Sequence, residues 1–143
     1  MINISSSINI YRPIKLVFDF ITFSENDFQW QYGTLASAQF SEGSARGGFF
    51  RSIGHLMGRR INSTFEITDF EANKKYGFKS LSGPMDSQTL YTFEMDKGST
   101  KINISTQASV TDFFQIKETI LEKQLKKQLK ENLAMLKKIL ETG

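Results

Sequence analysis

The last part of the chain, from Thr111 to Glu141, has the apolar periodicity of one long amphipathic helix. Its apolar residues recur at intervals of three or four, apart from one adjacent pair, and therefore share one helical face. About thirty residues at 1.5 Å each would form a rod about 45 Å long, which crosses a whole small domain. The residues of this face are Phe113, Ile116, Ile120, Leu121, Leu125, Leu129, Leu133, Leu136 and Leu140.

The chain before this helix has mainly the pattern of β-strands separated by short turns. The isoleucines of residues 2–10 occupy even positions only, which predicts a half-buried strand. Two short helices are predicted next, one that begins at Pro13 and runs through Ile21, and one that begins at Ser24 and ends near Trp30. Further strands are predicted at 30–40, 48–57, 60–70, 75–81, 88–95 and 101–109.

One helix cannot bury both faces of a flat sheet of about seven strands. We therefore expect an α+β domain in which a strongly curved antiparallel sheet wraps around the long helix. Gly33, Gly54 and Gly77 interrupt predicted strands and suit the bends that such a sheet needs. A single domain should span residues 1–143, and the curvature should leave a hollow between the sheet and the helix.

The composition excludes several classes of site. Cysteine is absent and His55 is the only histidine, so sites that need thiolates or two imidazoles are excluded. We predict no metal and no cofactor. The net charge of +3 is spread along the chain instead of forming a basic patch, which argues against a nucleic-acid partner.

The apolar content also bears on location and on the interior. No apolar run approaches the ~20 residues of a membrane span, and the N-terminus lacks the pattern of a signal peptide. These observations predict a cytoplasmic protein. The 13 phenylalanines outnumber tyrosine and tryptophan together. Phenylalanine has no polar group, so this excess predicts a large apolar interior or an apolar cavity wall.

The order of one strand, two short helices, six strands and one long helix is that of the helix-grip fold. Several segments resemble one branch of it, the polyketide cyclase/dehydrase and lipid-transport family of the SRPBCC superfamily, related to START domains and the birch pollen allergen. The resemblance covers almost the whole chain. It is carried by PIKLVFDFI at 13–21, QW at 29–30, GRR at 58–60, FEITDFE at 65–71, SGP at 82–84, YTFE at 91–94, GSTKI at 98–102 and LAMLKKILE at 133–141.

The resemblance implies a deep cavity between the curved sheet and the long helix. A small hydrophobic molecule, such as a lipid, an isoprenoid or a polycyclic aromatic, would bind there and could be transported. The fold itself does not fix the function, because one fold supports many sites. The chain also lacks the Cys and His ligands of the Rieske oxygenases in the same superfamily.

Alternation in the predicted strands places most of the candidate cavity residues on the inner face of the sheet. Each of them has two interpretations, since an inward aromatic side chain either fills the core or lines a void. We interpret some of them as lining residues, because the group is bulky for a close-packed small domain. The candidates are Trp30, Phe65, Ile67, Tyr76, Phe78, Tyr91, Phe93, Ile104, Thr106, Phe113, Phe114 and Ile120.

Two titratable residues are considered as acid or base groups. Histidine commonly acts as a general acid or base. His55 lies close to the turn at 58–60, however, so we expect it at the surface. Glu66 lies between the inward residues Phe65 and Ile67, so alternation directs it outward unless a bulge reverses the pattern. The glycine-rich segment 43–48 is interpreted as a hairpin loop over the cavity entrance.

Two other functions stay open at this point. One is a cyclase or dehydratase that acts on a polyketide-like substrate in the same cavity, which requires an acid or base group facing inward. The other is a stress- or chaperone-associated interaction module with a filled interior. We expect a monomer or a homodimer, with at most transient membrane contact through Lys123, Lys126, Lys127 and Lys130.

Overall fold

The computed structural model describes residues 1–31, 33–39, 47–56, 58–110 and 117–142. Helices and strands alternate along the chain much as the sequence pattern predicts. Their bounds are β1 (Ile2–Ile10), α1 (Ile14–Thr22), the 3₁₀ turn η1 (Ser24–Asn26), α2 (Asp27–Trp30), β2 (Thr34–Gln39), β3 (Phe49–Leu56), β4 (Arg59–Glu71), β5 (Lys75–Ser82), β6 (Met85–Asp96), β7 (Ser99–Val110) and α3 (Glu118–Thr142).

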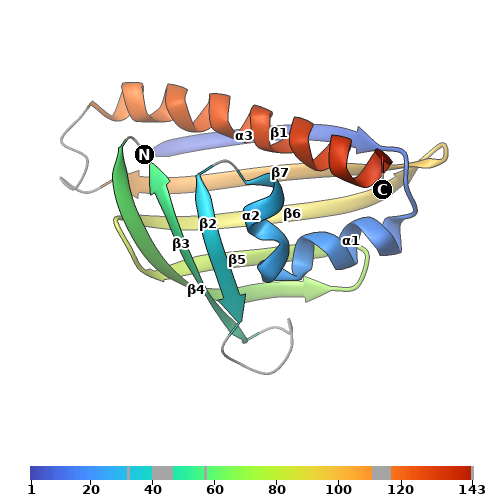
Figure 1. Ribbon diagram of the computed structural model, residues 1–143, viewed down its shortest axis with the longest axis horizontal. Coiled ribbons are helices and arrows are strands. Elements are labelled where there is room, and N and C mark those ends of the chain that lie inside the picture. Colours follow the sequence, from blue (N-terminus) through green and yellow to red (C-terminus); the bar gives the residue numbers. More distant parts are fainter. Residues whose placement is uncertain (32, 40–46, 57, 111–116, 143) are drawn as a thin grey trace.

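All strands belong to one antiparallel sheet of seven strands in the order β1-β7-β6-β5-β4-β3-β2. Strands β2 to β7 form a meander. Strand β1 lies at the edge of the sheet, and the full length of β1 pairs with β7. The sheet curves so that β2 and β3 cross in front of β5 and β6, and α3 lies along the side formed by β1 (Figure 1). The predicted α+β helix-grip fold, with two short helices after the first strand, is confirmed.

Bulges and glycines bend the sheet at identifiable places. The pairing of β4 with β5 shifts register between Ile67 and Asp69, and a bulge of this kind increases local twist. Opposite this bulge, a Cβ atom on Gly77 would lie 2.7 Å from Asp69 Oδ2, so a larger residue would require the Asp69 side chain to move. At the other end of the sheet, a Cβ atom on Gly54 would collide with the carbonyl oxygen of Gly33.

Two separate apolar clusters form the core. The larger one combines α1, the middle of the sheet and the C-terminal half of α3, and Phe18 of α1 lies 5.0 Å from Phe93 between ring centroids. The smaller one joins the start of β1 to Leu56 and Leu121. Leu129 packs against both clusters. Apolar contacts therefore continue along α3 from one cluster to the other. In the interior between the clusters, apolar contacts are not continuous.

The structure corrects several predicted boundaries. Helix α3 begins at Glu118, and Lys117 before it is not helical, so the uninterrupted helix predicted from Thr111 is wrong. Its 25 residues make a rod about 37 Å long. Strand β2 begins at Thr34 and not at Trp30, because Trp30 completes α2. Within the described residues, no helix combines the length and the apolar character that crossing a membrane requires.

Candidate functional site

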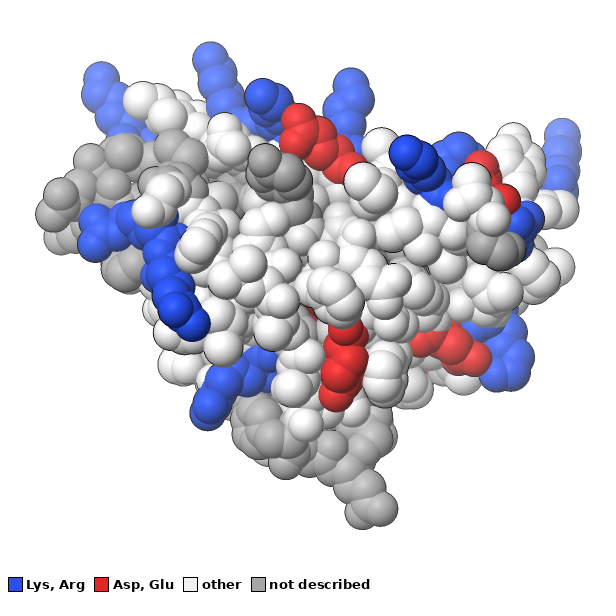
Figure 2. Space-filling model, viewed as in Figure 1, with Lys and Arg blue, Asp and Glu red and all other residues white. Residues whose placement is uncertain are grey.

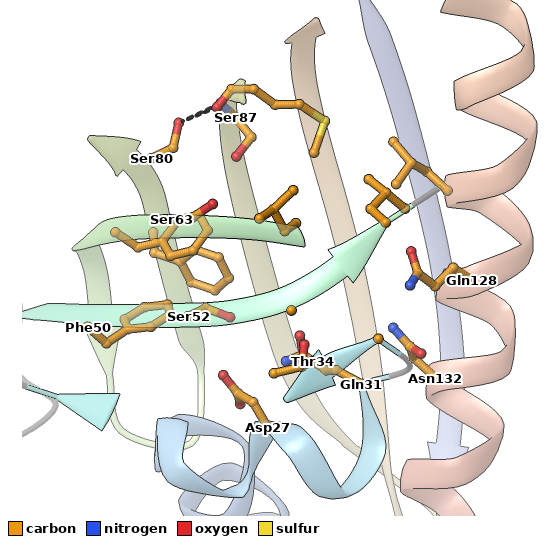
Figure 3. Close-up of a pocket in the computed structure, with 18 of the residues that line it drawn as sticks. Asp27, Gln31, Thr34, Phe50, Ser52, Ser63, Ser80, Ser87, Gln128 and Asn132 are labelled. Atoms are coloured by element: carbon orange, nitrogen blue, oxygen red, sulfur yellow. Dashed lines mark hydrogen bonds between the residues drawn. The ribbon is translucent and has the colours of Figure 1, made fainter. Parts of the chain in front are cut away.

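An internal cavity of about 200 Å³ lies between the curved sheet and the helices α2 and α3 (Figure 3). Strands β3 to β6 form its wall, α2 closes one end, and α3 closes one side. An apolar protein cavity of about 150 Å³ is large enough to hold benzene. The volume here therefore suits one or two rings or a short chain.

The cavity occupies the gap between the two core clusters. Phe50, Tyr76 and Tyr91 belong to the larger cluster and line it from one side. Leu56 of the smaller cluster, together with residues packed against that cluster such as Leu125, lines it from the other. The curved sheet holds the two clusters apart, so the space between them stays open instead of being filled by side chains.

Three phenylalanine rings form a rigid apolar wall. Phe50 and Phe65 face each other across β3 and β4, and Phe78 on β5 completes the group. Their ring centroids are 5.0 to 5.3 Å apart, a spacing typical of favourable aromatic pairs. Because each ring is held by the other two, the wall keeps its shape without a ligand.

A polar end of the cavity is formed by Asp27, Tyr76 and Tyr91. Asp27 is the first residue of α2 and is only 7% exposed, and its carboxyl points from α2 toward the cavity (Figure 3). Burial raises the pKa of Asp27 well above its usual value, the Ser37 hydroxyl opposes this in part, and the nearby Glu25 adds to the increase. The neutral acid therefore persists to higher pH than an exposed aspartic acid would allow.

The two tyrosines remain neutral phenols. Burial raises the pKa of Tyr76 well above its usual value, and Asp27, Tyr91 and Glu25 raise it further. Burial also raises the pKa of Tyr91, with a smaller contribution from Asp27. The two residues are paired across β5 and β6, with ring centroids 5.8 Å apart. The two phenols, and Asp27 while it is protonated, thus offer hydrogen-bond donors at one end of an apolar space.

Trp30 Nε1 of α2 is buried and has no hydrogen-bond partner among the described residues. Ser37 is also buried beside Asp27, and its hydroxyl lowers the pKa of that carboxyl. A buried polar group without a partner is costly, and such groups are concentrated at functional sites.

A surface groove between α2 and α3 adjoins the polar end of the cavity. Gln31, Gly33, Thr34 and Asn132 line both the cavity and this groove. Two exposed apolar side chains lie at the rim of this groove, Phe28 (56% exposed) and Met135 (44% exposed), beside the exposed Gln29 and Glu131. Lys and Arg side chains project mainly from the α3 edge, and the face over α2 and β2 is largely uncharged (Figure 2).

The predicted site residues divide into three groups by position. Phe65, Tyr76, Phe78 and Tyr91 line the cavity. Trp30, Ile67, Phe93 and Ile104 are buried in the larger core cluster and do not border the cavity. The Thr106 hydroxyl is 3.0 Å from the Thr89 hydroxyl, a hydrogen bond within the protein. Whether the four lining residues contact a ligand stays a prediction.

The helix candidates need correction. Ile120 is 51% exposed, so it does not line the cavity. Ile120 and Leu121 are adjacent and cannot both face inward, and the helix buries Leu121 at 1% exposure. Phe113 and Phe114 lie outside the described residues.

His55 and Glu66 both point away from the cavity. His55 borders the cavity rim, but its side chain is exposed, since Gly54 and Leu56 take the inner face of β3. Glu66 Oε1 is 3.4 Å from the Lys79 ammonium on the outer face. The pairing of β4 with β5 shifts register on both sides of Glu66, between Thr64 and Phe65 and between Ile67 and Asp69, yet Glu66 still pairs with Lys79. Of the loop predicted over the entrance, residues 43–46 lie outside the described residues.

Sequence reasoning missed the polar lining of the cavity. Asp27 falls within the short helix predicted from Ser24 to near Trp30, and the sequence pattern does not indicate its burial. Gln128 and Asn132 point from α3 toward the cavity (Figure 3). A signal was present, because Leu125, Gln128 and Asn132 are spaced by three and four and therefore interrupt the apolar face with two amides.

Comparisons with known proteins bear on the fold. No protein-family profile matches the sequence, and no curated protein matches it, whereas many solved structures match the fold. A START superfamily protein from Mycobacterium smegmatis is 14% identical with a TM-score of 0.74, over 99% of this chain and 96% of that one. Ara h 8.0201 is 10% identical with a TM-score of 0.75, and the match covers 99% of this chain and 98% of that one.

A third similar structure is the di-domain ARO/CYC protein BexL from the BE-7585A biosynthetic pathway. It is 14% identical with a TM-score of 0.76, over 99% of this chain and 47% of that protein. Identities this low establish the fold alone, and at that level they confirm the resemblance seen in the sequence. The chain has the helix-grip fold, which it shares with the START superfamily protein, with Ara h 8.0201 and with part of BexL.

Proposed function

We propose that this protein binds a small, largely apolar molecule in the cavity between its two core clusters. The observation that carries the proposal is the cavity of about 200 Å³, walled by mutually supported phenylalanine rings. Its volume favours an isoprenoid fragment, a short chain or a molecule of one or two rings over a lipid with two long acyl chains. The interaction-module alternative required a filled interior, which this cavity disfavours.

Desolvation supplies most of the expected affinity. A ligand that buries about 300 Å² of apolar surface gains about 7.5 kcal/mol at 25 cal/mol per Å². Association costs at least about 4 kcal/mol of this. We therefore expect dissociation constants in the millimolar range for ligands that make only apolar contacts.

The ligand enters between α2 and α3 in this proposal, and not past residues 43–48. Support comes from the four residues that the cavity shares with the surface groove, and from the exposed apolar side chains Phe28 and Met135 at its rim. Apolar side chains at the rim lower the cost of transferring an apolar molecule from water into the protein. Release by the same route would let the protein carry its ligand.

A cavity-filling variant tests the binding proposal. Ser52 faces the cavity from β3, so Ser52→Phe should fill it and abolish the binding of naphthalene observed in ¹H–¹⁵N NMR titrations. Ser105→Phe is the matched control, because Ser105 is exposed on β7 and does not line the cavity. Native mass spectrometry of protein purified from its own host should also reveal a bound small molecule. Unchanged naphthalene binding by Ser52→Phe, or no bound molecule from the native source, would count against the proposal.

A second candidate function is favoured by one observation, the buried carboxyl of Asp27 that lines the cavity and whose pKa burial raises. The dehydratase alternative required such an inward acid. Asp27 would donate its proton to a leaving hydroxyl, which departs as water, and the resulting carboxylate would accept a proton from the adjacent carbon. Incubation with a β-hydroxy ketone tests this, because wild-type protein should form the enone and Asp27→Asn should not.

A further inference from the structure

We propose that the cavity selects an uncharged ligand with a hydrogen-bond-accepting oxygen, such as a ketone, enone or quinone carbonyl, held at the end formed by Asp27, Tyr76 and Tyr91. This inference rests on the proposed binding function and adds the chemical class of the ligand. It predicts that shape alone does not determine affinity. The oxygen of the ligand would receive the hydrogen bonds that water otherwise makes with these groups.

The geometry places three polar groups from three elements around one end of the cavity. Asp27 comes from α2, Tyr76 from β5 and Tyr91 from β6, and all three line the cavity while being less than 10% exposed. Ser37, 7% exposed, lies beside Asp27, and its hydroxyl lowers the pKa of that carboxyl. A site built from buried polar groups rejects ligands that leave those groups unpaired.

The charges around this end favour a neutral ligand over an anion. No Lys or Arg lines the cavity within the described residues. The nearest other acidic group is Glu25 of η1, whose Oε2 accepts a hydrogen bond from the Gln39 backbone at 3.3 Å. Helix α3 contributes the neutral amides of Gln128 and Asn132, and His55 at the rim is exposed. A ligand carboxylate here would lack a counter-ion and would face two acidic residues.

A cationic ligand is also disfavoured. An ammonium group at this end would require Asp27 to lose its proton, which burial opposes. Both ions would then have to leave water, and the desolvation of two charges offsets much of their attraction. A carbonyl oxygen needs no ionisation on either side, since protonated Asp27 and both phenols donate to it directly.

The binding should weaken as pH rises. Asp27 is a donor only while protonated, and its ionised form repels a carbonyl oxygen. Glu25, Tyr76 and Tyr91 are the other titratable groups that face it, and the two phenols stay protonated because burial raises the pKa of each. Affinity for a carbonyl ligand is therefore highest at low pH and falls as Asp27 ionises.

Matched ligands of nearly equal shape test the inference by calorimetry and NMR titration. They are 2-acetylnaphthalene, 2-isopropenylnaphthalene, 1-(2-naphthyl)ethylamine and 2-naphthoic acid. We expect the ketone to bind about tenfold more tightly than the alkene, the size of one well-formed hydrogen bond. The amine and the acid should bind more weakly than the ketone at pH 6.

Variants assign the preference to Asp27. Asp27→Ala should abolish the preference for the ketone while keeping alkene binding. Asp27→Asn retains a donor, so it should keep the preference but lose the fall in affinity with rising pH. Asp86→Asn, an exposed site on β6 outside the cavity, should behave as wild type.

Equal affinities for ketone and alkene, or tightest binding of the amine or the acid, would overturn this inference and leave the binding of apolar molecules intact. Failure of all four ligands to bind would overturn the inference as well. The binding function would then be decided separately, by native mass spectrometry of protein from its own host.

Discussion

At the scale of single residues, the proposed ligand recognition depends on Asp27 more than on any other side chain. It is a buried acid without a cation among the described residues that line the cavity. Such a group costs stability once it ionises, and proteins retain it mainly where it serves a function. Stability and ligand recognition are thus coupled at this residue, because the same burial that favours the neutral donor penalises the folded state at higher pH.

Replacement of Asp27 by asparagine should therefore stabilise the protein in a pH-dependent manner. The folded-state pKa of Asp27 is raised above its unfolded value of 3.8. Its contribution to stability is thus fully present below that value and is lost as pH rises through the folded pKa. Relative to Asp27→Asn, wild type should lose about 1.4 kcal/mol per pH unit within this window.

Urea unfolding of both proteins from pH 3 to pH 8 measures the difference directly. Other groups titrate alike in the two proteins, so their effects cancel. A difference that stays constant across this range would show that folding does not raise the pKa of Asp27.

At the scale of elements, β3 and the turn before β2 pack backbone against backbone. Gly54 faces the cavity, and its position leaves no room for a side chain next to the Gly33 carbonyl. The backbone N–H of His55 donates to that same carbonyl at 2.7 Å, which locks the two segments together. This contact brings the N-terminal part of β2 over the cavity and sets the position of Gln31 and Thr34 at its entrance.

Gly54→Ala should destabilise the protein by about 2 kcal/mol or more, because the added methyl group meets backbone that cannot move aside. Ser52→Ala on the same face of the same strand is the control, with an expected loss below about 1 kcal/mol. Thermal unfolding of both variants provides the comparison. Similar melting temperatures for the two would mean that β3 and the β2 turn do not pack as described.

The gate between α2 and α3 also belongs to this scale. The chain has no cysteine, so the double variant Gln31→Cys/Asn132→Cys can be joined selectively by a short bismaleimide. The crosslink should slow ligand association and dissociation at least about tenfold, as expected when a gating motion is blocked. The same variant without the crosslinker is the control in stopped-flow fluorescence. Equal rates before and after crosslinking would place the entrance elsewhere.

Periodicity predicted the elements but not the depth of each side chain. The apolar face of α3 and the alternation in the strands were sufficient for the helix-grip fold, because these patterns depend on local spacing. They could not separate Phe65, which lines the cavity, from Phe93, which is buried in the core on the same face of the sheet. Asp27 could not be recognised because its burial depends on tertiary contacts of α2 with β2 and with α3, and α3 is far away in the sequence.

At the scale of the whole molecule, the sheet is curved enough to hold two apolar clusters without closing the space between them. The resulting cavity combines a rigid aromatic wall, a buried polar end and a gate with exposed apolar side chains at its rim. These features together support a protein that encloses a small ligand. In the enzymatic alternative, Asp27 would both bind the substrate and transfer the proton.

A crystal structure of the protein grown with 2-acetylnaphthalene tests the central claim most directly. We expect electron density for the two rings of the ligand against Phe50, Phe65 and Phe78. The carbonyl oxygen of the ligand should lie within about 3 Å of the Asp27 carboxyl or of a tyrosine hydroxyl. A structure in which these phenylalanine rings fill the space, with no ligand between the sheet and α3, would contradict it.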